Sequence, residues 1–187
     1  MDALLIALVG CLLGEVGGKS QLLVLSLAKR YEWDGAIIAG IVCAAIANAA
    51  ISALAGAWIG PMLGADARLL FLALALLFLG AGMVWPVDAP DPLSGWRTGP
   101  FLTSLLGLFI LGFGDGSQFL ILGVATRTAD PALAAIGGAI GVIVALVPVV
   151  VLRDGLFALP LRVVRWVGAG IMVLTGVILL INALHLV

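Results

Sequence analysis

The chain has 187 residues, of which 64% are hydrophobic and only 10% are charged, and its mean hydropathy is +1.30. A water-soluble domain is about half apolar and about a quarter charged, so this composition excludes a soluble enzyme and a disordered tail. The net charge of −1 and the lack of a basic patch exclude a nucleic-acid-binding protein. The sequence therefore predicts an all-α integral membrane protein whose main environment is the lipid bilayer.

Six apolar stretches are each long enough for a membrane-spanning helix, which needs roughly 20 residues. They cover approximately residues 3–28, 35–59, 68–85, 101–126, 132–152 and 163–187. The first is expected to be a retained membrane segment, because no basic region precedes it and no Ala-x-Ala cleavage site follows it. The longest polar stretch, rich in proline and glycine, joins the third and fourth segments. It predicts a first three-helix repeat (1–87), a linker (88–100) and a second three-helix repeat (101–187).

Basic residues between the segments predict the orientation in the membrane. One side collects Lys29, Arg30, Arg97, Arg153, Arg162 and Arg165, and the other collects only Arg68 and Arg127. By the positive-inside rule, the first side and the linker lie in the cytoplasm and both termini lie outside it. We expect the bacterial inner (plasma) membrane as the location.

The two halves share a motif at an offset of 97 residues. The first segment contains GEVGGKSQ and the fourth contains GFGDGSQ, so that Gly17, Ser20 and Gln21 match Gly114, Ser117 and Gln118. Since each half has three helices, the halves are expected to be inverted relative to each other, as in many secondary transporters. The clustered glycines weaken both helices at the same point, where such transporters bind their substrate.

Three charged residues fall inside the predicted helices, and all three belong to the repeated motif: Glu15, Lys19 and Asp115. Each costs about 2.5–3.5 kcal/mol at a helix centre on insertion scales, which favours a functional ion or proton site. Neutral oxygens nearby come from Ser20, Gln21, Ser117 and Gln118. The structural alternative is a buried ion pair of Lys19 with Glu15 or Asp115, since Glu15 and Lys19 share a face of a regular helix.

Other polar or small residues in the helices are weaker candidates. Asn48 and Asn182 are explained equally well by hydrogen bonds between helices. The Gly-x-x-x-Gly pairs, which are Gly10/Gly14, Gly56/Gly60 and Gly137/Gly141, are typical of close helix packing.

The repeated motif resembles that of the GDT family of cation/proton exchangers (uncharacterised protein family 0016), within the wider group of amino-acid and cadmium exporters. The family pattern is Glu, a hydrophobic residue, Gly, Asp, Lys or Arg, and Ser or Thr, once in each half. The two copies here read Glu15-Val16-Gly17-Gly18-Lys19-Ser20 and Gly112-Phe113-Gly114-Asp115-Gly116-Ser117. The resemblance implies a secondary transporter that exchanges Mn²⁺ or Ca²⁺ for protons, with no permanently bound cofactor.

On this interpretation the metal-binding residues are Glu15, Asp115, Gln21, Gln118, Ser20 and Ser117, and Lys19 modulates their charge. Glycine stands at three acidic or basic motif positions: Gly18, Gly112 and Gly116. One acid remains in each half, which favours a single composite site over two equivalent ones. The chain is also expected to be capable of forming a homodimer.

Two alternatives stay open. The first is a transporter of the same architecture for another ion or solute, such as an anionic or zwitterionic one held by Lys19. The second is a non-transporting membrane scaffold in which the three intramembrane charges neutralise one another. An enzyme is not expected, because the helix cores contain no histidine and the chain has no Cys/His metal-binding spacing.

Overall fold

The computed structural model describes residues 1–157 and 160–185, and all the regular secondary structure in that part of the chain is helical. The elements in chain order are α1 (Asp2–Glu15), α2 (Lys19–Arg30), α3 (Asp34–Ile59), the 3-10 turn η1 (Gly60–Met62), α4 (Ala65–Val84), α5 (Gly99–Gly112), α6 (Gly116–Thr128), α7 (Pro131–Leu152), α8 (Asp154–Phe157) and α9 (Leu161–Ala183). The prediction of an all-helical protein is confirmed for these residues.

Four helices are each long and apolar enough to cross a membrane: α3 with η1, α4, α7 and α9. The pairs α1–α2 and α5–α6 reach that length only together, and they bend by 64° and 67° at their junctions. The chain therefore has four to six candidate spans, at the places where six were predicted. The sixth predicted segment ends earlier than expected, because α9 stops at Ala183, and residues 186–187 lie outside the described part.

The two bent pairs break where the sequence predicted weak helices. Gly17 has φ +65° and Gly114 has φ +79°, a left-handed conformation that glycine adopts without steric cost. In the first break Gly18 N donates to Glu15 O, and in the second Asp115 N donates to Gly112 O, each at 3.0 Å. The breaks thus have the same local geometry at positions 97 residues apart.

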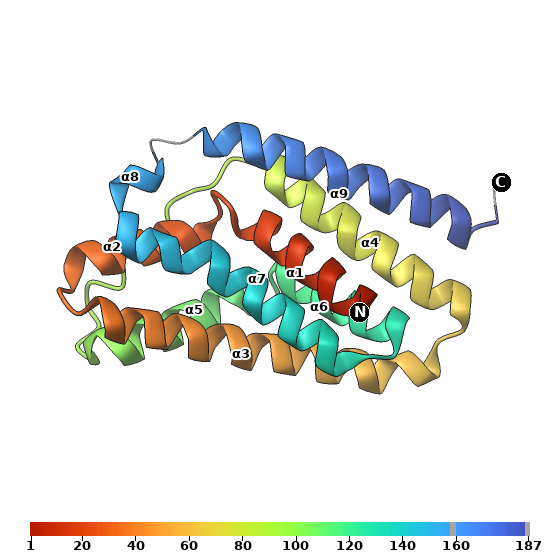
Figure 1. Cartoon of the computed structure of the whole chain (residues 1–187), viewed down its shortest axis with the longest axis horizontal. Helices are drawn as coiled ribbons and strands as arrows, with labels where there is room; N and C mark the ends of the chain where they lie inside the picture. The colour runs from red at the N-terminus through yellow and green to blue at the C-terminus, as the bar shows by residue number, and fades with distance from the viewer. Residues whose placement is uncertain (158–159, 186–187) are drawn as a thin grey trace.

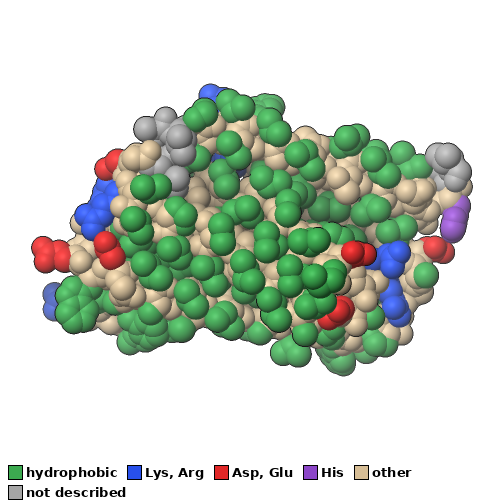
Figure 2. Space-filling view, in the orientation of Figure 1, with side chains coloured by type: hydrophobic (Ala, Val, Ile, Leu, Met, Phe, Trp, Pro, Cys, Tyr) green, Lys and Arg blue, Asp and Glu red, His purple; other side chains and the backbone are tan. Residues whose placement is uncertain are grey.

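The surface matches an integral membrane protein. Figure 2 shows hydrophobic side chains over the middle of the molecule, with charged side chains gathered towards its two ends. Large apolar side chains such as Leu54, Phe78 and Leu174 are each more than 60% exposed on different helices. A soluble monomer rarely exposes apolar patches of this extent, whereas lipid solvates them.

Helix packing depends on small residues. In Figure 1, α4 and α9 run side by side along one edge of the molecule, and α1 lies next to α7. A Cβ atom on Gly137 would overlap Leu4 O, and one on Gly141 would overlap Leu8 O, so these glycines let α7 approach the backbone of α1. This confirms the prediction that Gly137 and Gly141 form a close-packing face.

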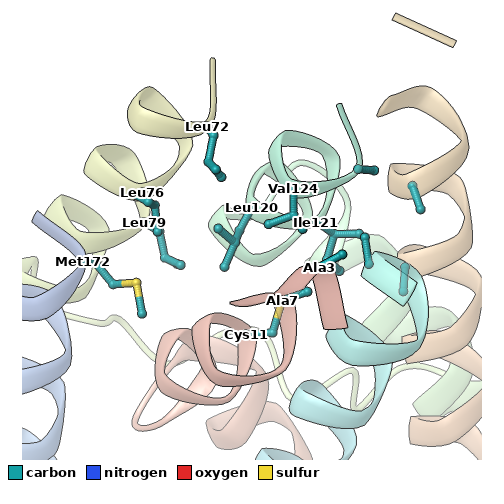
Figure 3. Packing of buried hydrophobic residues seen from close by; sticks show 14 of the residues in the cluster. Ala3, Ala7, Cys11, Leu72, Leu76, Leu79, Leu120, Ile121, Val124 and Met172 are labelled. Atoms are coloured by element: carbon teal, nitrogen blue, oxygen red, sulfur yellow. The ribbon is translucent and has the colours of Figure 1, made fainter. Parts of the chain in front are cut away.

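A cluster of buried apolar side chains joins the first and second halves of the chain. Figure 3 shows Leu72, Leu76 and Leu79 of α4 facing Leu120 and Val124 of α6. Ala7 and Cys11 of α1 also belong to this cluster. The cluster thus packs α1, which precedes the first break, together with α6, which follows the second.

We predict that Gly141→Ala destabilises the protein by about 1–3 kcal/mol, because the added methyl group forces α7 away from α1. The measurement is the free energy of unfolding in detergent. Gly170→Ala in α9 is the matched control, since a Cβ there meets nothing within 4 Å. Equal stability of the two variants would contradict the packing described here.

Candidate functional site

A buried contact joins the two helix breaks, while Asp115 in the second break is itself exposed. Glu15, the last residue of α1, is only 5% exposed. Its Oε1 accepts a hydrogen bond of 2.8 Å from Ser117 Oγ in the first turn of α6. Because these residues are 102 positions apart in the sequence, this bond joins the break of the first half directly to that of the second.

Two cavities flank this contact, and Glu15, Ser20 and Asp115 line both of them. The smaller has a volume of about 40 Å³ and is also lined by Ser117, Gln118 and Asn48. The larger, of about 320 Å³, extends past Lys19 to Trp85, whose side chain is exposed. The structure thus brings the two predicted acids, both serines and Gln118 to one place.

Gln21 and Gln118 have equivalent structural contacts. Gln21 Oε1 accepts from Gly17 N at 2.8 Å, and Gln118 Oε1 accepts from Gly114 N at 3.1 Å. Each glutamine therefore satisfies a backbone N–H that its helix break leaves free. Gln21 also donates from Nε2 to Ala145 O at 2.8 Å and does not line either cavity. Their assignment as metal ligands stays a prediction, and their amide oxygens already hold the breaks.

Lys19 does not form the buried ion pair that the sequence offered as a structural alternative. Its side chain is exposed, and no carboxylate of the described residues lies within ion-pair distance of it. The expected pair with Glu15 required a regular helix, but α1 ends at Glu15 and α2 begins at Lys19. The break removes the shared helix face, so the buried ion pair predicted as the structural alternative is wrong for this conformation.

Sequence reasoning missed the role of Arg165. Its Nη1 donates to Gly17 O at 2.6 Å, and its Nε donates to Met83 O at 3.1 Å. Arg165 therefore connects α9 to the first break and to the end of α4, and it lines the larger cavity. In the sequence Arg165 indicates only the orientation in the membrane, because carbonyl partners leave no signature there.

The two asparagines also differ in position. Asn182 is exposed and donates from Nδ2 to Ile178 O within its own helix, which is a structural contact. Asn48 is buried in α3 and lines the smaller cavity. In the sequence both asparagines have the same explanation, but in the structure Asn48 lines a cavity beside the two acids.

The donor set consists of oxygen atoms. No group of three or more His, Cys, Asp or Glu side chains with metal-binding spacing occurs in the described residues. Two carboxylates and two hydroxyls line the smaller cavity, and hard divalent cations prefer such oxygen ligands. Such a lining is chemically able to bind a hard divalent cation.

The chain is similar to known proteins over most of its length. A family model described as "Divalent cation/proton antiporter GDT1" matches residues 3–91 and residues 100–186. A protein of Vibrio cholerae serotype O1 with the name "Putative manganese exporter" is 32% identical over 178 residues, which cover 93% of this chain and 88% of that protein. No solved structure matches the chain.

We predict that Arg165→Lys lowers the stability of the protein in detergent by about 1–3 kcal/mol, because lysine has a single nitrogen in place of the rigid guanidinium fork whose Nε and Nη1 bond carbonyls on α4 and at the first break. Thermal unfolding of the purified protein measures this. Arg162→Lys is the matched control on the same helix, since Arg162 is exposed and makes no side-chain hydrogen bond among the described residues. Unchanged stability of Arg165→Lys would show that these bonds do not hold the break.

Proposed function

Since the chain belongs to the GDT1 family of divalent cation/proton antiporters, we propose that it exports Mn²⁺ from the cytoplasm in exchange for protons. It is an integral membrane divalent cation transporter, and its family indicates transport rather than an enzymatic reaction. The name of the Vibrio cholerae relative favours manganese as the cargo and export as the direction.

Glu15 and Asp115 are the proposed exchange site, and they bind either the cation or protons. The observation that carries this proposal is the Ser117–Glu15 hydrogen bond, with both acids on the walls of the same two cavities. Charged groups inside membrane helices are expensive and are functional by default. Ser20 and Ser117 would supply neutral oxygens, and the free carbonyl groups at the C-terminal ends of α1 and α5 could complete the shell.

The ligand chemistry favours Mn²⁺ over Ca²⁺. Ca²⁺ takes 6–8 oxygens, usually with several carboxylates, in large flexible sites. Mn²⁺ accepts a mixture of carboxylate, carbonyl and water oxygens in octahedral geometry. Two carboxylates beside a cavity of about 40 Å³ suit the smaller ion better.

Transport requires that the site open alternately to the two sides of the membrane. The repeated break geometry and the family match in each half support an inverted-repeat architecture, in which one half moves relative to the other around a fixed site. The larger cavity extends towards Trp85 and Pro86, next to the linker. We propose that this cavity is the path to the cytoplasm.

Charges at the linker end support this orientation. Lys29 pairs with Asp154 at 2.6 Å and Arg153 with Asp34 at 3.2 Å. Arg30 donates to two linker carbonyls, at 2.6 and 2.7 Å. These basic residues share one end of the molecule, which the positive-inside rule places in the cytoplasm. Both termini then lie on the other side, in our proposal for a bacterial inner membrane.

We predict that the purified protein moves Mn²⁺ across proteoliposome membranes when a pH gradient is imposed, with protons moving in the opposite direction. Glu15→Gln and Asp115→Asn should each reduce the flux to the level of empty liposomes, because neutral amides cannot bind protons or balance the cation charge. Internal Mn²⁺ and pH indicators measure both fluxes. Glu32→Gln and Asp88→Asn, which change exposed loop acids, are matched controls and should keep wild-type flux.

Flux that survives both site substitutions would refute the carboxylate site. A wild-type protein that moves an amino acid but no metal would favour the alternative cargo. Absence of any flux from a folded protein would favour the scaffold.

A second prediction concerns the ion. Ca²⁺ at the same concentration as Mn²⁺ should reduce Mn²⁺ flux by less than about twofold, because the site offers too few carboxylates for Ca²⁺. A competition assay with labelled Mn²⁺ measures this. Complete block by equal Ca²⁺ would instead assign the site to calcium.

A further inference from the structure

Asn48 presents an unpartnered oxygen to the smaller cavity. The residue is 9% exposed, and the cavity wall also contains Glu15 and Asp115. Its Nδ2 donates to Phe109 O at 3.4 Å, while its Oδ1 is buried without a hydrogen-bond partner in the described residues. Reversing the amide would place two oxygens against each other, so the oxygen faces away from Phe109. A buried acceptor left unpaired costs about 1–3 kcal/mol, which indicates that something other than the chain binds it.

We infer that Asn48 Oδ1 is a ligand of the transported divalent cation and takes the place of an acid that the second half lacks. This inference rests on the proposed function, because it assumes that the cation binds between Glu15 and Asp115. It adds to the site a neutral ligand from α3, a helix that carries neither copy of the motif.

The repeat explains why an asparagine occupies this place. At the offset of 97 residues, Glu15 corresponds to Gly112, and Asn48 corresponds to Ala145. The broken span of the first half thus carries an acid, Glu15. The helix that follows the broken span of the second half, α7, carries the small residue Ala145, whose carbonyl oxygen accepts from Gln21 at 2.8 Å. The second half has glycine on the broken span and an amide on α3. The two polar side chains, Glu15 on α1 and Asn48 on α3, both line the smaller cavity.

Gly112 provides the space for this amide. A Cβ atom on Gly112 would lie 2.7 Å from Asn48 Nδ2, closer than real Cβ contacts allow. Any side chain at position 112 therefore competes with Asn48 for the same volume. The glycine and the asparagine act as a complementary pair.

A structural water is the rival occupant. Gln118 Nε2 also lines this cavity and is also unpartnered in the described residues. A cavity of about 40 Å³ can hold a water, and one water could join Asn48 Oδ1 to Gln118 Nε2. Two carboxylates on the same wall favour a cation near Asn48, and the two occupants predict different kinetics.

The experiment measures Mn²⁺ flux against Mn²⁺ concentration in proteoliposomes. Asn48→Ala should raise KM for Mn²⁺ by about tenfold with kcat retained, the lower end of the effect of groups that support a metal. Asn48→Asp should lower KM by a similar factor, because a carboxylate attracts the cation more strongly. Asn182→Ala removes an amide outside the cavity and should keep the wild-type KM.

Gly112→Ala supplies an independent test. It should raise KM as Asn48→Ala does, because its methyl group displaces the amide. In the Asn48→Ala background it should have no further effect, since the clash no longer exists. Gly170→Ala, with nothing within 4 Å of the added atom, controls for the general effect of glycine replacement in a helix.

The outcomes separate this inference from the proposed function. Wild-type KM in both Asn48→Asp and Gly112→Ala, while the wild-type protein transports Mn²⁺, would overturn the ligand role and favour the structural water. If Asn48→Ala does not fold, the opposite KM shifts of Asn48→Asp and Gly112→Ala still decide. Absence of Mn²⁺ flux in the wild-type protein would refute the proposed function itself.

Discussion

The site depends on two membrane helices that break at a left-handed glycine. A break exposes backbone N–H and C=O groups, and lipid offers them no hydrogen-bond partners. Gln21 and Gln118 satisfy the free N–H groups of Gly17 and Gly114. Arg165 satisfies the carbonyl of Gly17. These hydrogen bonds reduce the energetic cost of breaking a helix in lipid. The breaks in turn bring Glu15 and Ser117 into contact.

The sequence predicted the helices and their breaks because both depend on local properties. Apolar length predicts membrane helices, and clustered glycine predicts weak points, without knowledge of the tertiary structure. The pairing of Lys19 with Glu15 failed because it assumed that the helix continues through Gly17 and Gly18. Arg165 was unpredictable for another reason: its partners are carbonyl groups, which every residue has.

Each copy of the motif contains only one acid, but the cavities are lined by the acids of both copies. By motif alone, the second half lacks the acid that corresponds to Glu15, and the first lacks the one that corresponds to Asp115. In three dimensions the two remaining acids line the same cavities, so each half contributes the group that the other has lost. One acid in each half, on the walls of the same two cavities, is the arrangement that the proposed composite site requires.

The two halves differ in how their breaks are held. Arg68 precedes Arg165 by the repeat offset of 97 residues, yet Arg68 donates from Nε to Leu63 O at 3.0 Å. Arg165 instead holds the first break through Gly17 O, and no side chain of the described residues bonds Gly114 O in the same way. Two halves in identical states could open to both sides at once, which would dissipate the gradients. In the proposed alternating-access mechanism the two halves differ in conformation at any moment, and the unequal contacts of Arg68 and Arg165 are a difference of that kind.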